Sequence, residues 1–274
     1  MPTSKIRKKR RIAKIKSLAE RLGIIFSGTV FVLAVLVFLA RLDAVTVNSI
    51  FIEGNEMTDP SEILSLSGDV LSGSYVFLPR GNIFIYPKKE LEAYLSYYLP
   101  HINSVEIKRR DLNTLEINIV ERQPKALWCG MEPGRLRVCF YTDDEGFIYS
   151  RAPYFSGDVY FRYFGGDVDP DRPLRSHFAP IEMIGDIEEL IYHLENIGLD
   201  AKGVHLREDD LKILLGNDSS IYLIRDGSFE DSFSRLLSLL RRSEYSFIEN
   251  GEPAFSYIDL RFGSRIFYKL KEDE

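Results

Sequence analysis

The sequence predicts an α+β protein with a single apolar helix near its N-terminus. Two observations predict this class. One uncharged stretch has the length of a membrane span. The rest of the chain contains some segments with apolar residues at every second position, as in strands, and others with apolar residues at helical spacing. We expect a β-α-α-β-β domain over residues 45–122 and a mixed β-rich domain with two helices over residues 123–270, followed by a short tail at 271–274.

The apolar stretch runs from Leu22 to Ala40 and contains no charged residue. A helix needs about 20 such residues to cross a hydrocarbon core of about 30 Å, where it satisfies its own backbone hydrogen bonds. We therefore predict a transmembrane helix over residues 22–41. Residues 1–21 are rich in Lys and Arg, so the positive-inside rule places this tail in the cytoplasm. Everything after Arg41 is then expected outside the cytoplasmic membrane.

Two other interpretations of this stretch are weaker. A cleaved signal peptide has an apolar core of about 7–15 residues and a small-residue cleavage site. Here the apolar run is longer, and Ala40-Arg41-Leu42-Asp43-Ala44 is a poor cleavage site. A buried soluble helix would be apolar along one stripe, whereas this stretch is apolar on all sides. We expect an uncleaved anchor.

Charge divides the chain into a basic and an acidic part. Of the 35 Lys and Arg residues and the 41 Asp and Glu residues, 10 basic residues and one acidic residue lie within residues 1–41. The remainder is therefore strongly acidic, which argues against nucleic acid as a partner. The basic tail lies beside the anchor, where topology and contact with anionic membrane lipid account for its charge.

The first extracytoplasmic domain begins with a strand around Ile50 and Ile52, which leads into a turn at Glu53-Gly54-Asn55. The run Asp59-Pro60-Ser61-Glu62 then predicts the start of a helix. An Asp at the cap position accepts backbone hydrogen bonds, and Pro fits the first helical position because no N–H is needed there.

A second helix is expected between Pro87 and Pro100. Its apolar residues have helical spacing: Leu91, Tyr94, Leu95, Tyr98 and Leu99. Two strands with alternating apolar residues follow, at 105–107 and 115–119. The two helices are expected to cover one face of the resulting three-stranded sheet.

The second domain is predicted to be a mixed sheet with two helices. One hairpin is centred on Pro133-Gly134 and another on Asn217-Asp218. Apolar spacing predicts a helix over 187–197, and a capping box at Ser228 predicts a helix over 229–242. Residues 153–179 are rich in Gly, Asp, Pro and aromatic residues, and we expect a long loop or insertion there.

The order β-α-α-β-β directly after an anchor resembles a POTRA domain, and its residues resemble those of FtsQ/DivIB, which are bitopic bacterial cell-division proteins. Three runs carry the resemblance: Ile50-x-Ile52-x-Gly54-Asn55, Pro100-His101-Ile102-x-x-Val105-x-Ile107-x-Arg109 and Thr114-Leu115-x-Ile117-x-Ile119-x-Glu121-Arg122-x-Pro124. The third run is the most specific, because it continues into Ala126 and Trp128. The strand Tyr257–Arg261 also resembles one near the end of FtsQ-type chains.

The resemblance implies a non-enzymatic scaffold at the division septum, with no cofactor and no small-molecule substrate. Such a scaffold would influence septal peptidoglycan synthesis by assembling division proteins, not by catalysis. In this family the terminal strands receive a segment of FtsB, which is paired with FtsL, as an added strand. We expect the last strands at Phe255–Arg261 and Arg265–Leu270. By position, the predicted contact residues are Arg261, Phe262, Arg265, Phe267 and Tyr268. The alternative is an internal role, with Phe267 or Tyr268 in the core and Asp259–Arg261 as an internal pair.

The two cysteines, Cys129 and Cys139, flank the turn-rich segment Gly130–Gly134. In an extracytoplasmic hairpin two such residues can lie opposite each other and form a disulfide. Two free thiols in a reducing habitat are the alternative. A zinc site needs more ligands, and no His lies nearby.

The sequence contains no recognisable catalytic motif: G-x-S-x-G, H-E-x-x-H and the Walker loop are all absent. Asp167-x-Asp169-x-Asp171 lacks the Gly and Glu of a calcium loop. An anchored cell-wall hydrolase would therefore lack a nucleophile or metal set. The alternative function is a POTRA-bearing accessory of polypeptide transport across the envelope, which cellular localisation distinguishes from a septal scaffold.

Overall fold

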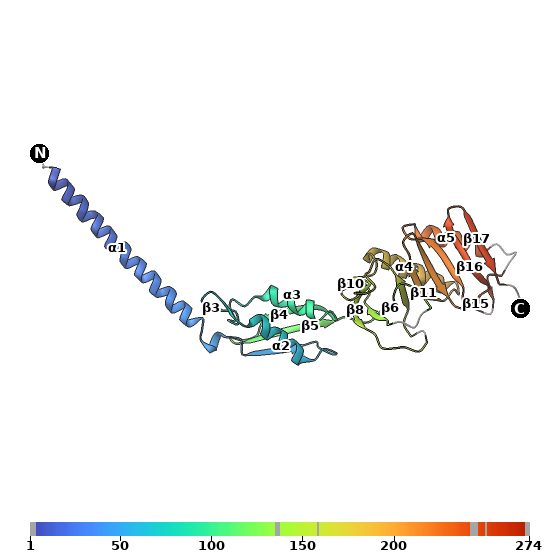
Figure 1. The fold of residues 1–274 in the computed structure, drawn as a ribbon, viewed down its shortest axis with the longest axis horizontal. Helices are drawn as coiled ribbons and strands as arrows, with labels where there is room; N and C mark the ends of the chain where they lie inside the picture. Colours follow the sequence, from blue (N-terminus) through green and yellow to red (C-terminus); the bar gives the residue numbers. More distant parts are fainter. Residues whose placement is uncertain (1–3, 135–137, 158, 242–245, 250, 272–274) are drawn as a thin grey trace. The chain divides into compact units, whose positions relative to one another are not determined.

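Figure 1 shows the computed structural model of the chain, which describes residues 4–134, 138–157, 159–241, 246–249 and 251–271, with side chains from residue 20 onward. The chain forms two compact units, Met1–Glu121 and Arg122–Glu274. Helices and sheets are both prominent, and one apolar helix lies near the N-terminus. The predicted α+β class is therefore confirmed.

The first unit begins with helix α1 (Ser4–Leu39). Its segment Glu20–Leu39 is long and apolar enough to cross a membrane, and its apolar side chains are largely exposed, as contact with lipid requires. The helix also includes most of the basic tail, because the residues before the span are mostly good helix formers without Gly or Pro. It ends two residues before the predicted limit at 41 and is followed by a 3-10 turn, η1 (Asp43–Val45).

Three strands form the sheet of the first unit, in the order β1-β5-β4. β1 (Ser49–Glu53) is parallel to β5 (Thr114–Glu121), which pairs antiparallel with β4 (Ile102–Arg109). Helices α2 (Pro60–Leu71) and α3 (Lys88–Tyr98) pack against this sheet. They share one core with it, which includes Ile63, Val70, Leu91, Leu95, Leu115, Ile117 and Ile119. The β-α-α-β-β order is the one that the sequence predicts.

Two local features of this unit follow directly from the sequence. At the start of α2, Asp59 Oδ1 accepts a hydrogen bond from the Ser61 N–H at 2.8 Å, and Pro60 is the first helical residue. In the turn after β1, Gly54 has a φ of +83°, and a Cβ there would lie 2.0 Å from the Ile119 carbonyl oxygen. Only glycine fits this turn without moving β5.

The end of β5 is tied to the loop that follows β1. Glu121 accepts hydrogen bonds from the backbone N–H groups of Met57 and Thr58, both at 2.8 Å, and from the Thr58 hydroxyl at 2.5 Å. His101 Nε2 lies 2.8 Å from the same hydroxyl. Burial alone would raise the pKa of Glu121, but these hydrogen bonds outweigh it and lower the pKa below its usual value.

A short two-stranded hairpin completes the first unit. It consists of β2 (Ser74–Tyr75) and β3 (Leu78–Pro79), with Tyr75 opposite Leu78. Val76 and Phe77 are therefore the two residues at its tip. The strands are short because the apolar residues of this segment do not alternate over more than two positions.

The second unit is built on a ten-stranded sheet in the order β10-β8-β7-β6-β9-β11-β12-β13-β16-β17. The strands are β6 (Ala126–Trp128), β7 (Phe140–Thr142), β8 (Phe147–Arg151), β9 (Arg162–Gly165), β10 (Ser176–His177), β11 (Ala201–Leu206), β12 (Asp210–Leu215), β13 (Ser220–Ile224), β16 (Phe255–Phe262) and β17 (Arg265–Leu270). A separate small hairpin joins β14 (Ile248–Glu249) to β15 (Glu252–Pro253). The predicted hairpins around Pro133-Gly134 and Asn217-Asp218 are β6–β7 and β12–β13.

Helices α4 (Ile181–Asn196) and α5 (Phe229–Leu240) pack on one face of this sheet (Figure 1). The buried side chains between the helices and the sheet include Ile187, Leu194, Ile213, Ile221, Leu236, Ile258 and Leu260. A smaller cluster on the opposite face joins Leu127, Cys129 and Phe164. Because side chains alternate across a strand, β6 contributes Ala126 and Trp128 to the large core and Leu127 to the small cluster.

The expectation of a loop or insertion at 153–179 is wrong in part. This segment contains β9, which lies between β6 and β11 and is parallel to both. Tyr163 and Phe164 are buried on its two faces, so the strand is internal to the sheet. The aromatic residues around them give this strand an apolar surface. The Gly and Asp residues on either side make the same segment resemble a loop in the sequence.

The two helices of this unit differ slightly from their predicted ranges. α4 begins at Ile181, six residues before the expected 187, and Pro180, whose ring fixes its own φ, is the N-cap residue directly before the helix. At the start of α5, Ser228 Oγ accepts a hydrogen bond from the Asp231 N–H at 3.1 Å, as the capping box predicts. α5 ends at Leu240 with Arg241 as its cap, and Arg242, the predicted last residue, lies outside the described residues.

Candidate partner interface

The last strand of the second unit, β17, forms one edge of the ten-stranded sheet. It pairs antiparallel with β16, and Gly263, with a φ of +57°, lies in the turn between them. In the part of the chain that the structure describes, no strand pairs with the outer side of β17. The opposite edge of the sheet is β10, which has two residues. β17 is therefore the longer of the two edges that a further strand could join.

One face of β17 packs toward the helices. Tyr268 lies opposite Ile258, which is fully buried, and the Tyr268 ring is 5.3 Å from the ring of Phe247 in an edge contact. Ile266 and Leu270, on the same face, pack against the large core. Tyr268 is 37 % exposed, so its ring is partly covered by the core while the rest of it meets solvent.

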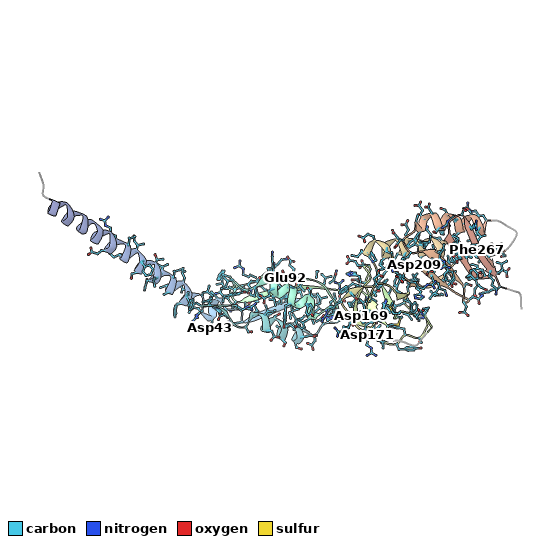
Figure 2. All side chains as sticks on the ribbon, turned by 45° about the horizontal axis from the view of Figure 1, so that its top comes forward. Asp43, Glu92, Asp169, Asp171, Asp209 and Phe267 are labelled. Carbon is cyan, nitrogen blue, oxygen red and sulfur yellow. A yellow bond between two sulfur atoms is a disulfide. The ribbon has the colours of Figure 1, made fainter. Side chains whose placement is uncertain are left out.

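The other face of β17 is more open. Phe267 lies opposite Asp259 and is 48 % exposed, and Phe262, at the end of β16, is 54 % exposed. Their rings contact edge to face with centroids 5.2 Å apart. Arg265 pairs in register with Phe262 and is exposed. Figure 2 marks Phe267 in this last hairpin. These residues form a small aromatic and basic surface beside the open strand edge.

Arg261 occupies a different environment. Its Nε and Nη2 donate to the two carboxylate oxygens of Asp259 at 2.9 and 2.7 Å, and its Nη1 donates to Asp210 at 2.5 Å. Both carboxylates are buried. Hydrogen bonding to Asp259 raises the pKa of Arg261, so its charge is permanent. Burial alone would raise the pKa of Asp259, but its hydrogen bonds with Arg261 outweigh burial and lower it.

The helix-free face beside this ion pair is centred on Tyr222. The guanidinium carbons of Arg261 and Arg207 lie 5.1 and 5.5 Å from the centre of its ring, and Lys212 Nζ lies 5.4 Å from it. Tyr257 contacts the same ring edge to face. The face of the sheet that continues from Phe267 is therefore lined by aromatic rings and cations.

The structure thus brings together three of the predicted contact residues, Phe262, Arg265 and Phe267. Tyr268 lies on the opposite face of the same strand, and Arg261 is engaged with two carboxylates inside the unit. Sequence reasoning did not select Tyr222 or Lys212. A signal for them exists, since each is a polar or amphipathic residue between two apolar neighbours in its strand.

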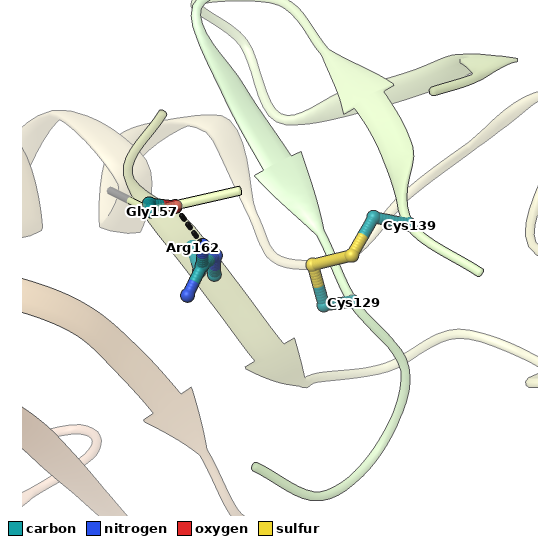
Figure 3. The surroundings of a disulfide bond; sticks show 4 residues. All are labelled: Cys129, Cys139, Gly157 and Arg162. Carbon is teal, nitrogen blue, oxygen red and sulfur yellow. Dashed lines mark hydrogen bonds between the residues drawn. A yellow bond between two sulfur atoms is a disulfide. The ribbon is translucent and has the colours of Figure 1, made fainter. Parts of the chain in front are cut away.

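Cys129 and Cys139 are joined by a disulfide at the loop end of the β6–β7 hairpin (Figure 3). Trp128 pairs with Phe140 across this hairpin, so the next antiparallel position places the two cysteines opposite each other. Arg162 on β9 lies nearby and donates to the Gly157 carbonyl. Oxidation of the two thiols in the cell stays a prediction.

Among the described residues, no group of three or more His, Cys, Asp and Glu side chains is arranged to hold a metal ion. Two of the carboxylates in Asp167–Asp171 have partners within the protein. Asp167 pairs with Arg225, which is distant in the sequence. Asp169 Oδ1 accepts a hydrogen bond from the Asp171 N–H at 3.0 Å (Figure 2). This segment is a turn in the loop after β9.

The chain was compared with models of known protein families. Residues 45–122 match the family model described as POTRA domain, FtsQ-type. The chain carries an FtsQ-type POTRA domain. This match supports the assignment to the FtsQ/DivIB family, which is a family of non-enzymatic scaffolds. A comparison with curated proteins finds no match.

Within the FtsQ-type POTRA domain, the residues that carry the family resemblance have structural roles. Gly54 makes the turn after β1, and Glu121 holds the loop at Met57 and Thr58. The next residue, Arg122, belongs to the second unit, where it forms an ion pair with Asp143 and lies 4.3 Å from the centre of the Phe147 ring. In the pair Glu121-Arg122, the Glu121 side chain therefore holds a loop of the first unit, and the Arg122 side chain forms an ion pair in the second unit.

Proposed function

We propose that this protein is a bitopic scaffold of the bacterial divisome, whose strand β17 binds FtsB/FtsL-like coiled-coil partners at the septum. The FtsQ-type POTRA domain and the helix of membrane length fit a bitopic divisome protein. One observation supports the partner site above all. β17 ends the large sheet, and exposed Phe262, Arg265 and Phe267 lie beside its outer side.

The mechanism of binding is strand addition. A partner segment extends the sheet by pairing its backbone with the outer N–H and C=O groups of β17, each net hydrogen bond contributing about 0.5–1.5 kcal/mol. The two phenylalanine rings provide an apolar anchor that the added strand covers. Arg265 and Lys269, both exposed on β17, favour a partner with acidic side chains and set its register.

The topology proposed for this function places the basic N-terminal tail in the cytoplasm and both folded units outside it. The measurement is protease digestion of intact spheroplasts. Digestion of the part beyond Arg41 agrees with this orientation, whereas full protection of that part contradicts it.

The partner site is tested by co-purification of the full chain with an FtsB-like coiled-coil protein from membranes. We expect Phe267→Ala and Arg265→Glu each to weaken recovery by about tenfold or more, because the first removes the apolar anchor and the second repels the acidic side chains of the partner. The matched control is Tyr97→Ala, which removes an exposed aromatic ring from the POTRA domain. Fluorescence of Trp128, the single tryptophan of the chain, reports whether the second unit remains folded.

Three results would contradict this function. Unchanged recovery of the partner by both β17 variants would remove the edge-strand site. A fluorescent fusion spread evenly over the envelope, instead of collecting at midcell, would favour the transport accessory. Cleavage of cell-wall substrate by the purified chain would replace the scaffold with a hydrolase.

A further inference from the structure

We propose that the hairpin tip Val76–Phe77 inserts into the outer surface of the same lipid bilayer that α1 spans, so that the POTRA domain rests on the membrane. This inference depends on α1 as a membrane span and is independent of the partner proposed for β17. The occupant of the hairpin surface is therefore lipid, at the level of the headgroups and the first acyl carbons.

The hairpin is fastened to the point where α1 leaves the membrane. Arg41, two residues after the helix, donates from its Nε to the Phe77 carbonyl at 3.0 Å. Asn82 Nδ2 donates to the Ala40 carbonyl at 2.8 Å, and Ile83 N–H donates to the Val45 carbonyl at 2.9 Å. These bonds join the segment around the hairpin to the end of the helix. Because Arg41 is the first charged residue after the apolar span, its side chain marks the headgroup level, and Phe77 lies at that level.

The side chains at the tip have the chemistry of the membrane interface. Val76 is 83 % exposed and Phe77 65 %, and Tyr75 beside them is 43 % exposed. Aromatic rings are enriched at this depth in membrane proteins, and the charged ends of arginine side chains extend to the phosphates. Arg80, whose guanidinium lies 5.4 Å from the centre of the Tyr75 ring, belongs to the same segment.

The backbone conformation at the hairpin tip supports the membrane contact independently of the side-chain exposure. Val76 has a φ of +51°, and it is the first of the two residues between the paired strands. Glycine is favoured at such a position, and a β-branched residue with positive φ is a genuine outlier. A strained valine that contacts almost nothing in the unit contributes little to the fold. Its apolar side chain therefore points to a role at a surface outside the chain.

Other apolar and basic residues lie at the same end of the domain. Asn48 donates to the Asn113 carbonyl at 2.9 Å, which places the β4–β5 turn next to the segment that leaves α1. Leu112 in this turn is 61 % exposed. At the end of β4, the Arg109 guanidinium lies 5.3 Å from the centre of the exposed Phe84 ring. Arginines over aromatic rings suit a surface that meets lipid phosphates above and acyl chains below.

The test measures the depth of the hairpin tip in the full chain, reconstituted in nanodiscs of phosphatidylcholine and phosphatidylglycerol. Val76→Cys and, separately, Phe77→Cys are labelled with an environment-sensitive maleimide fluorophore. The matched control is Met57→Cys, because Met57 is 80 % exposed and lies beside Glu121 at the other end of β5. The chain without an added cysteine is labelled in parallel and gives the background from Cys129 and Cys139.

We expect blue-shifted emission at both hairpin positions and strong quenching by nitroxide-labelled lipid. Quenching by aqueous iodide should be about threefold weaker there than at Met57, because ions do not reach the acyl boundary. Emission and quenching equal to those at Met57 would overturn the proposal. Probes shielded from both quenchers would also overturn it, since a protein surface would then cover the hairpin.

Discussion

Arg261 and Asp259 lie two residues apart on β16 and form a two-point ion pair, with Nε–Oδ1 at 2.9 Å and Nη2–Oδ2 at 2.7 Å. The same guanidinium reaches Asp210 on β12, which lies on the far side of β13. One cation on β16 therefore pairs with two buried carboxylates, one on its own strand and one on β12, two strands away in the sheet. This pair shapes the surface next to β17 without belonging to its open edge.

Replacing Arg261 should destabilise the second unit. Arg261→Gln leaves Asp259 buried without its ion-pair partner and Asp210 with Arg207 alone, 2.6 Å away, and because the Arg261 side chain is partly exposed we expect a loss of about 1–3 kcal/mol in the free energy of unfolding. Denaturant unfolding followed by Trp128 fluorescence measures it. The matched control is Arg265→Gln on the neighbouring strand, which should change stability by less than about 0.5 kcal/mol. Equal effects of both substitutions would contradict the internal role of Arg261.

Glu121 should make the POTRA domain sensitive to acid. Its pKa is lower in the folded chain than in the unfolded chain, so its contribution is complete above the unfolded value and is lost as the pH falls through the folded value. We expect amide exchange at Met57 and Thr58 to accelerate, once corrected for intrinsic rates, as the pH falls below about 4.5. Hydrogen–deuterium exchange measures this directly.

The substitution Glu121→Gln provides the control for that acid effect. It removes the charge at every pH, so the exchange of the two amides should already be faster at neutral pH and should vary little more on acidification. A destabilisation of about 1–2 kcal/mol is expected from the loss of charge-assisted hydrogen bonds. If the variant kept the acid dependence of the original chain, another group would be responsible for it.

The disulfide should form in the extracytoplasmic compartment. Mass spectrometry of the chain digested without reduction is expected to yield the linked peptides of Cys129 and Cys139. Reduction should lower the stability of the second unit by about 2–3 kcal/mol, because the bond closes a short loop. Recovery of both cysteines as alkylated thiols from unreduced membranes would show that the habitat keeps them reduced.

Val76→Gly should show whether the valine at the hairpin tip stabilises the fold or serves only to contact a surface outside the chain. Glycine accepts the positive φ of this position, so the POTRA domain should keep its stability or gain up to about 1 kcal/mol. Exchange protection of the core amides at Leu115 and Ile117 measures it. The matched control is Val120→Gly on β5, also an exposed valine, which should lose about 1 kcal/mol because its extended backbone favours a β-branched residue. A loss at Val76 equal to that at Val120 would mean that the valine stabilises the fold.

Much of the first unit could be predicted from its sequence, because its signals are local. Asp59 and Pro60 specify the start of α2 within one turn, and the spacing of Leu91 and Leu95 specifies the buried side of α3. The last two strands of the second unit were also predicted, at Phe255–Arg261 and Arg265–Leu270, with the first of them supported by a family resemblance. The four residues of β9 escaped prediction because their flanks resemble a loop and their burial depends on β6 and β11.

The sequence by itself determined the apolar span and the β-α-α-β-β order of the first unit, because charge, periodicity and turn chemistry act between near neighbours. Only the tertiary structure decided that Arg261 pairs with Asp210 across 51 positions of sequence and that Phe77 lies beside Arg41 across 36. Such pairs depend on how packed elements bring distant segments together. No pattern within one segment encodes which partner a side chain will meet.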